Sequence, residues 1–374
     1  MYDVCFVLPS YSYNRPAGGY DVIYELSRRL VNDRYRVIII TPGGNTKYLP
    51  HFIESIPEDK IGRLFKLFFP FLESSLFQKF INPALRKLRG IDYDFSILSD
   101  VHQKTIRDPI NTKLGTKKII ATSWETAYYV EDFLKTHSSD GYYFIQHDES
   151  LIGYSGKFSE RAKDTYNLHL NKIVTNTPLM QLFQSSNPKY VPIGVNPIIL
   201  KHKDTKKIPN SILTLFGRGE SKGFPYALDA LKLLNEKDKG LKLLAFGNVN
   251  KELVPEWVEY HYRPSDEELL KLYEDSEIFI LPSIVEGVSL VAMEAMAMGC
   301  ACVITDCGGT SEYTRDGLNC LLVPIRNSEA IVLAVEKLHS DENLRNFISQ
   351  NGIIYLKKYT YETTYKHFKK AISE

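Results

Sequence analysis

Two carboxylates stand eight residues apart in a stretch that is otherwise almost free of charge. Between Glu286 and Asp306 the only charged residue is Glu294, which is set among Ala, Met, Val and Cys. A carboxylate without a partner is costly to bury, so both glutamates should face a polar cleft. Glu294 lies about one turn into the helix predicted over 290–298, and its side chain points back toward the helix start. It could accept hydrogen bonds from two ribose hydroxyls, and Glu286 could face a hydroxyl of a group being transferred.

Glycine-rich turns at two other places could hold phosphate. Arg218 and Lys222 lie in FGRGESKGF, directly after a predicted strand. Two cations at a strand end suit a diphosphate whose negative charge grows as it leaves, although a solvated surface turn is the alternative. Gly18-Gly19 stands between a predicted strand and a predicted helix. Its N–H groups could approach an anion at the positive end of that helix.

The predicted Ala-Met helix has recognisable signals at both ends. The strand IFILPS ends just before it, so the loop from Glu286 to Ser289 is a further place where an anion could bind. Ser289 is the expected N-cap because its hydroxyl can accept a hydrogen bond from a free N–H of the first turn. Gly299 is the expected stop because glycine adopts the left-handed conformation at helix ends.

Composition limits the class of protein. A chain of 374 residues is too long for one ordinary core and fits two domains. Hydrophobic residues at 44% and charged residues at 24% are typical of a soluble globular protein, and a net charge of +1 argues against nucleic-acid binding through overall basicity. No stretch reaches the ~20 apolar residues of a membrane span. The N-terminal MYDVCFVLPS predicts a first strand and not a signal peptide.

The five cysteines form no CxxC pair and have no histidine at metal-binding spacing. They are predicted to be buried free thiols, which fits a reducing cytoplasm. They are Cys5, Cys300, Cys302, Cys307 and Cys320.

Strand-like and helical runs alternate along both halves of the chain. This pattern predicts parallel sheets in an α/β fold. It restarts at SILTLFGR after a passage rich in Pro and Lys, so a domain boundary is expected near 195–210. Two doubly wound domains would bind a ligand at the carboxyl ends of their strands, in the cleft between them. The predicted strands are DVCFVLPS, YRVIIIT, KKIIATS, GYYFIQ and NKIVTN, then SILTLFG, LKLLAFG, IFILPS, CACVITD and NCLLVP.

One segment interrupts this alternation. Residues 60–90 contain seven Lys or Arg residues against Glu73 alone, with six phenylalanines interleaved. This composition is typical of an interfacial helix pair on anionic lipid. A helical hairpin that covers the sheet and has a solvated basic rim is the alternative. Asp92-Tyr93-Asp94 matches a DxD metal signature, but it directly precedes the strand-like FSIL, so a loop acid pair is predicted instead.

Residues 286–324 resemble the family 4 retaining glycosyltransferases of the GT-B fold. That pattern runs E-G-F-G-L-P-x-L-E-A-M-A, then G-G-x-x-E, then D-G-x-N-G-x-L-V-P, against EGVSLVAMEAMAMG, GGTSE and DGLNCLLVP here. The likeness extends over essentially the whole chain. It implies two Rossmann-like domains facing across a cleft: an acceptor-side domain over 1–197 and a domain that binds the nucleotide sugar over 198–356. A C-terminal helix at about 357–374 would pack back onto the first domain.

The resemblance implies a role for each matching residue. Glu294 would bind the ribose, Glu286 a hydroxyl of the donor sugar, and Arg218 and Lys222 the diphosphate. His147 would lie near the transferred sugar. The catalytic set is Glu286, His147, Arg218 and Lys222. The implied donor site comprises Gly18, Gly19, Arg218, Lys222, Arg263, Glu286, Gly287, Val288, Ser289, Leu290, Val291 and Glu294. The departures from the pattern are Val288, Ser289 and Val291, where Phe, Gly and Pro are usual, and they affect how the phosphate loop closes.

The first half is also similar to surface-polysaccharide rhamnosyltransferases. The similarity is carried by TSWETAYYV, YYFIQHDES and AKDTYNL. The candidates for contact with the acceptor or donor sugar are Trp124, Gln146, Asp148 and Glu149, and a core aromatic is the alternative for Trp124.

The resemblance implies a retaining, metal-independent glycosyltransferase without a cofactor. It would transfer a sugar from a nucleotide diphosphate sugar to a glycan or lipid-linked acceptor in surface polysaccharide or glycoconjugate synthesis. The predicted location is the cytoplasm, with contact to the inner face of the membrane left open. The alternatives are a catalytically silent nucleotide-sugar binding subunit and a nucleotide-sugar epimerase on the same fold.

Overall fold

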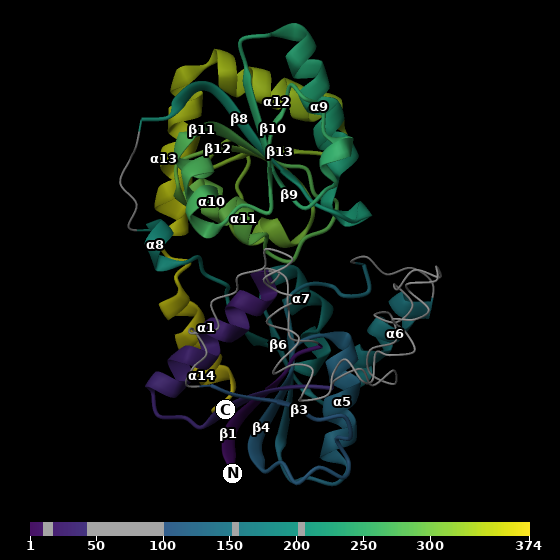
Figure 1. The fold of residues 1–374 in the computed structure, drawn as a ribbon. Coiled ribbons are helices and arrows are strands. Elements are labelled where there is room, and N and C mark those ends of the chain that lie inside the picture. The colour runs from purple at the N-terminus through teal and green to yellow at the C-terminus, as the bar shows by residue number, and fades with distance from the viewer. Residues whose placement is uncertain (10–17, 43–100, 152–156, 201–205) are drawn as a thin grey trace, which may run out of the picture.

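Parallel strands organise both halves of the chain in the computed structural model, which describes residues 1–9, 18–42, 101–151, 157–200 and 206–374. Each half forms one sheet, and the two α/β domains are stacked in Figure 1. The strand order is β3-β2-β1-β4-β5-β6-β7 in the first domain and β10-β9-β8-β11-β12-β13 in the second. The pairing that includes the central strands is parallel in both sheets. The predicted α/β class with two Rossmann-like domains is therefore confirmed.

The elements of each domain follow in chain order. The first domain contains β1 (Tyr2–Val7), α1 (Gly18–Asn32), β2 (Val37–Thr41), β3 (His102–Thr105), β4 (Thr116–Ala121), α5 (Trp124–Leu134), β5 (Asp140–Ile145), α6 (Lys157–Asp164), β6 (Asn171–Val174), α7 (Thr177–Leu182) and β7 (Lys189–Tyr190). Next come α8 (Pro197–Leu200), β8 (Ile208–Phe216), α9 (Phe224–Lys237), β9 (Lys242–Gly247), β10 (Glu259–Tyr262), α10 (Asp266–Asp275), β11 (Ser276–Leu281), α11 (Leu290–Ala297), β12 (Ala301–Thr305), β13 (Leu321–Val323), α12 (Ser328–Ser340), α13 (Glu342–Leu356) and α14 (Tyr361–Ala371).

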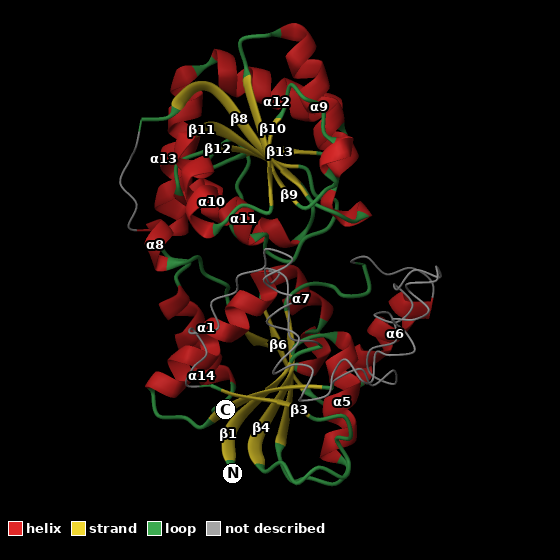
Figure 2. Ribbon diagram, in the orientation of Figure 1, coloured by secondary structure: helices red, strands yellow, loops and turns green. Residues whose placement is uncertain are grey.

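Helices cover both faces of each sheet because the central strands are apolar on both sides. Strand β2, VIIIT, is buried at every position. In the first domain, α1 and α14 pack on one face and α5 packs on the other. In the second domain, α10, α11 and α13 cover one face, and α9 and α12 cover the opposite face. Figure 2 shows this arrangement as red helices on either side of the yellow strands. The loops that follow the strands therefore remain available at the edge of each sheet.

Helix α14 returns from the second domain to the first. Its Phe368 stacks on Phe6 of β1 with ring centroids 5.7 Å apart. The N–H of Gly194 donates to Thr364 Oγ1 at 2.9 Å, and the N–H of Val195 donates to the carbonyl of Tyr359 at 3.0 Å. The chain thus crosses between the domains twice at neighbouring points, and both termini lie on the first domain (Figure 1). The boundary between residues 197 and 198 stays a prediction.

Three strands were not predicted from the sequence: β3, β7 and β10. The first and third are polar sequences, HQKT and EYHY, and the second has only two residues, KY. The three lie at sheet edges, where one side has no neighbouring strand. An edge strand needs no apolar run, so periodicity does not reveal it. The basic segment 60–90 and the acid pair of Asp92 and Asp94 lie outside the described residues.

Candidate active site

Glu286 and Lys222 are brought together at the carboxyl ends of two neighbouring strands. Lys222 Nζ donates to Glu286 Oε1 at 2.8 Å, and Ser283 Oγ donates to the same oxygen at 2.7 Å. The side chain of Glu286 is 7% exposed and that of Lys222 is 35% exposed. The carboxylate is therefore compensated within the protein, while the ammonium group keeps a face toward solvent that could meet an anionic ligand.

Backbone contacts hold the turn of Lys222 against the loop of Glu286, residues 282–289, called the donor loop below. The N–H of Ile284 donates to the carbonyl of Ser221 at 2.7 Å. Gly223 has a φ of +66°, and a Cβ atom there would lie 1.9 Å from the carbonyl oxygen of Pro282. Because β8 pairs with β11, the two turns leave the same sheet edge side by side. The pairing of Lys222 with Glu286, which was not predicted from the sequence, thus arises from strand order.

The first domain meets the donor loop at the end of β5. A Cβ atom on Gly287 would lie 2.3 Å from the carbonyl oxygen of Gln146 and 3.1 Å from Cβ of His147. Position 287 therefore requires glycine, because the two domains approach too closely there to leave room for a side chain. Gln146 also donates from Nε2 to the carbonyl of Gly19 at 3.2 Å, at the start of α1. The predicted residues Gly19, Gln146, His147, Glu286 and Lys222 therefore lie together where the two domains meet.

His147 is neutral in this environment. Burial lowers its pKa to about 4, and the positive charge of Lys222 acts in the same direction. The negative charge of Glu286 opposes both effects without cancelling them. A neutral imidazole near pH 7 can orient a hydroxyl group by accepting or donating a hydrogen bond, but it brings no positive charge to the site.

Protein stability should depend on pH through His147. The ordinary imidazole pKa is 6.5 and the folded value is about 4, so the unfolded chain binds more protons between these values and stability falls as the pH is lowered. We expect His147→Asn to reduce this loss of unfolding free energy by an amount on the order of 1–3 kcal/mol. Thermal unfolding between pH 4 and pH 7 checks this, with the exposed His169→Asn as control. Equal pH slopes in wild type and His147→Asn would contradict it.

Helix α11 begins at Leu290, but its start differs from the prediction. Ser289 occupies the N-cap position with a φ of +56°, and its hydroxyl makes no capping hydrogen bond. Its Oγ is buried and, in the described part of the chain, has no hydrogen-bond partner. The capping prediction is wrong because a left-handed backbone does not turn the side chain toward the first N–H groups. The predicted stop is confirmed: Gly299 has a φ of +78°, and the N–H of Cys300 donates to the carbonyl of Ala295 at 2.9 Å.

Glu294 lies on the second turn of α11 and is partly buried. The hydroxyl of Tyr273, from α10, donates to Glu294 Oε2 at 3.2 Å. The negative charge of Glu294 also contributes to raising the pKa of Tyr361, after burial and the charge of Asp21. Glu294 thus lies near Tyr361 of α14 as well as near Tyr273 of its own domain. Its position at the junction of the two domains is compatible with the predicted contact to a ribose.

Arg218 and Arg263 are exposed at the same sheet edge as the donor loop. Arg218 follows β8, and its backbone N–H donates to Asn248 Oδ1 at 2.7 Å. Arg263 follows β10, and its guanidinium lies 5.4 Å from the centroid of the Tyr262 ring. The guanidinium groups are therefore at the surface of the second domain.

Val288, Leu290 and Val291 are partly buried at the start of α11. All three pack against the core of the second domain, and Val288 and Leu290 also pack against the core of the first. The start of the helix is thus wedged between the domains. Gly18 is the first residue of α1. It directly precedes Gly19, whose carbonyl accepts the hydrogen bond from Gln146 on the side of the first domain.

Three of the sugar-contact candidates have structural partners in the first domain. Trp124 is fully buried, as expected for a core aromatic, and its backbone N–H donates to Glu149 Oε2. Burial, reinforced by the nearby charge of Glu125, raises the pKa of Glu149 well above its usual range. Asp148 Oδ1 accepts hydrogen bonds from Ser150 Oγ at 2.6 Å and from the hydroxyl of Tyr166 at 2.8 Å. Gln146 alone of the four candidates has a contact to the donor loop among those described.

The five cysteines are free and buried, as predicted. Burial raises the pKa of Cys307 to about 11 and that of Cys320 to about 12. Their thiols are protonated at neutral pH and therefore poorly nucleophilic.

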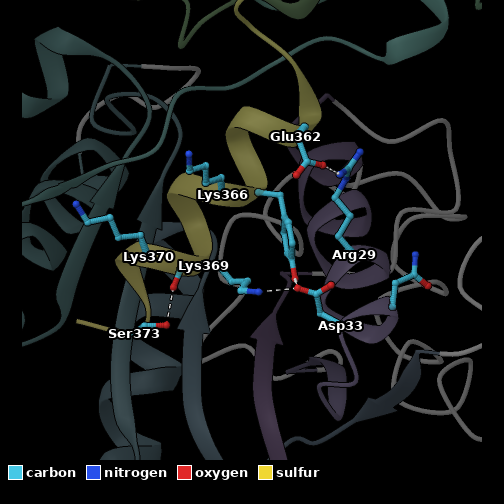
Figure 3. A pocket seen from close by; sticks show the side chains of 9 residues that line it. Arg29, Asp33, Glu362, Lys366, Lys369, Lys370 and Ser373 are labelled. Atoms are coloured by element: carbon cyan, nitrogen blue, oxygen red, sulfur yellow. Dashed lines mark hydrogen bonds and ion pairs between the residues drawn. The ribbon is translucent and has the colours of Figure 1, made fainter.

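A concave feature lies away from these residues. A groove of about 500 Å³ runs between α1 and α14 on the first domain (Figure 3). Lys369 and the hydroxyl of Tyr365 donate to Asp33 at 2.6 and 2.8 Å, and Arg29 pairs with Glu362. Its acidic groups are thus paired with basic groups of the facing helix. None of the predicted site residues lines this groove.

The second domain, which contains the donor loop, matches a known protein family. Residues 199–354 match the family model described as Glycosyl transferases group 1. The matched region contains β8 to β13, Lys222, Glu286 and Glu294. It is therefore the part of the chain that carries both glutamates and the cation paired with one of them.

Two relatives and one solved structure illustrate the similarity. An uncharacterized glycosyltransferase of Methanocaldococcus jannaschii is 28% identical over 305 residues, covering 78% of this chain and 83% of that protein. The N,N'-diacetylbacillosaminyl-diphospho-undecaprenol alpha-1,3-N-acetylgalactosaminyltransferase of Campylobacter jejuni is 31% identical over 92 residues, covering 25% of this chain and 24% of that enzyme. The chain thus spans only about a quarter of the latter relative. Anabaena HepE, in complex with UDP and glucose, has a TM-score of 0.70 at 13% identity and covers all of both chains. The fold is GT-B, and the family match and relatives together support a glycosyltransferase.

Proposed function

We propose that this chain is a retaining glycosyltransferase that moves a sugar from a nucleotide diphosphate sugar to a glycan or lipid-linked acceptor. The observation that carries the proposal is the Lys222 and Glu286 pair, 2.8 Å apart, on a loop that touches Gln146 and His147 of the facing domain. A cation, a carboxylate and a neutral imidazole brought together where the domains meet suit a donor with a diphosphate and a sugar. HepE, which shares the fold, has been solved with UDP and glucose.

Catalysis in this proposal is positional and electrostatic. Lys222 and Arg218 would stabilise the leaving diphosphate, Glu286 would hold a sugar hydroxyl, and Glu294 would hold the ribose. The acceptor would attack on the face from which the diphosphate leaves, which retains the configuration at the anomeric carbon. The proposed reaction requires no metal ion and no cofactor, since cationic side chains and helix N–H groups would face the diphosphate.

Surface polysaccharide or glycoconjugate synthesis is the proposed setting. The Campylobacter relative is named for a lipid-linked acceptor, a diphospho-undecaprenol. Among the residues that the structure describes, no helix combines the length and apolar character needed to cross a bilayer. A cytoplasmic protein at the inner face of the membrane stays a prediction, and its proposed contact, 60–90, lies outside the described residues.

A panel of nucleotide sugars scored by thermal unfolding tests the donor. A donor that binds only the folded state raises Tm, and release of nucleotide diphosphate should then require an acceptor. Binding without release would indicate a silent subunit, and conversion of the sugar without an acceptor would indicate an epimerase. Failure of every nucleotide sugar to raise Tm would contradict the proposal.

Glu294→Ala should weaken donor binding by about 10- to 100-fold, since a carboxylate that accepts two ribose hydroxyls contributes a few kcal/mol. The Tm of the free protein should change little because Glu294 is only partly buried. Calorimetric titration with the donor that raised Tm measures the affinity. Glu329→Ala on α12 is the control, because it removes a carboxylate from the first turn of another helix in the same domain. Wild-type affinity in Glu294→Ala would remove this residue from the donor site.

A further inference from the structure

Asn176 links the two domains through its side chain. It stands at the end of β6 as the N-cap of α7, where Oδ1 accepts from the N–H of Leu179 at 2.9 Å. The other end of the same amide, Nδ2, donates to the carbonyl of Gly287 in the donor loop at 3.1 Å. Asn176 is 2% exposed. The capping hydrogen bond fixes the orientation of the amide, so that Nδ2 points toward the donor loop.

The next residue, Thr177, holds a carboxylate of the second domain. Its N–H and Oγ1 donate to Glu312 Oε2 at 3.0 and 2.9 Å. The hydroxyl of Tyr190 donates to Glu312 Oε1. Burial and this hydrogen bond raise the pKa of Tyr190, so the phenol stays protonated and remains a donor. One carboxylate thus receives three hydrogen bonds from two elements of the facing domain, and hydrogen bonds to a charged acceptor are the stronger kind.

Glu312 and the donor loop cannot move independently. Glu312 ends a short 3-10 helix, Gly309–Glu312, that follows β12. A Cβ atom on Gly309 would lie 1.5 Å from the carbonyl oxygen of Gly287, so the backbones are in direct contact. The N–H of Glu286 also faces the carbonyl of Cys307 at 3.4 Å. A displacement of Glu312 is therefore expected to displace Glu286 and Gly287 as well.

We infer that Asn176, Thr177, Tyr190 and Glu312 form an interdomain clamp that sets the position of the donor loop against Gln146 and His147. The four are positioning residues, since they act through Gly287 and Glu286. The effect on sugar transfer rests on the proposed function. The clamp itself concerns domain closure and can be measured without any substrate.

Small-angle scattering of the full chain tests the clamp. Glu312→Ala removes the acceptor of the three hydrogen bonds from the facing domain, and Tyr190→Phe removes one donor with little change in packing. We expect the radius of gyration to rise in both, more in Glu312→Ala, because the domains separate. Glu312→Gln keeps one acceptor oxygen and should give an intermediate value. Tyr2→Phe, which removes a hydroxyl that contacts His102 at 2.7 Å within the first domain, is the matched control. Unchanged scattering in both Glu312→Ala and Tyr190→Phe would overturn the clamp.

Kinetics separate positioning from a purely structural role. In Tyr190→Phe and Glu312→Gln we expect kcat to fall about 10- to 100-fold through misplacement of the donor loop. Donor Kd, measured by calorimetry, should stay within about threefold because most of the proposed donor contacts come from the second domain. Wild-type kcat in variants with altered scattering would overturn the positioning role. Absence of turnover in the wild type would defeat the proposed function and leave the scattering result valid.

Discussion

Lys222→Met should lower the rate of sugar transfer by about 10²- to 10³-fold, as expected when one group that stabilises developing charge is removed. Lys222 Nζ lies 2.8 Å from Glu286 Oε1, and in the proposed reaction it would face the leaving diphosphate. Methionine keeps an unbranched stem of similar length and removes the charge. Release of nucleotide diphosphate in the presence of acceptor measures the rate. A transfer rate within threefold of wild type would exclude Lys222 from catalysis.

The same change should also lower stability. Glu286, at 7% exposure, would keep the Ser283 hydroxyl but lose its ammonium partner. Breaking a buried ion pair costs about 3–5 kcal/mol, and we expect about 1–3 kcal/mol here because the side chain of Lys222 is 35% exposed. The double variant Lys222→Met with Glu286→Gln should recover stability without recovering transfer. Recovery of both would show that the rate loss came from unfolding.

Gly287→Ala should reduce transfer by at least about 100-fold, because a displacement of about 1 Å at a reacting site is enough for such a loss. The added Cβ atom would lie 2.3 Å from the carbonyl oxygen of Gln146, the residue that directly follows β5. This oxygen belongs to the backbone, so a change of side-chain rotamer cannot relieve the clash. The clash lies between domains, so it can be relieved by opening the cleft. We therefore expect a larger radius of gyration with two folded domains, measured by scattering alongside transfer.

Gly115→Ala is the matched control for this prediction. A Cβ atom there would lie 3.8 Å from the nearest atoms, those of Met1, which is ordinary contact. Neither Gly287 nor Gly115 has the left-handed conformation that disfavours alanine, so the comparison isolates the clash. Wild-type transfer and scattering in Gly287→Ala would mean that the close approach of the domains is not required.

Much of the fold could be predicted from local patterns. Apolar runs such as VIIIT of β2 are buried at every position and can be recognised without knowledge of their neighbours. Polar edge strands such as β3, HQKT, have no such pattern. Ser289 was expected to cap α11 from its residue type alone, but its φ of +56° depends on how the donor loop is packed. Residue type predicts a cap only when the backbone takes the ordinary extended conformation.

The sugar-contact candidates show a similar limit. Gln146 and Glu149 stand in one short segment, yet only Gln146 contacts the donor loop in the described structure. Glu149 accepts a hydrogen bond from the backbone N–H of Trp124 inside the first domain. Side chains leave a turn in different directions, and sequence spacing does not determine which of them will face the cleft. The residues that were missed, Asn176 and Thr177, follow β6 as ordinary helix-start residues, and nothing in their types indicates a partner more than a hundred positions away.

The sequence by itself determined that parallel strands would end in loops rich in glycine and charge, and that Glu286, Lys222 and His147 would stand at such ends. These features depend on local periodicity and on the rule that parallel strands present their carboxyl ends together. Only the tertiary structure decided that Lys222 neutralises Glu286, that burial and Lys222 keep His147 uncharged, and that Glu312 is held by the facing domain. Those outcomes depend on distances between segments remote in the chain, which are set when the two domains pack against each other.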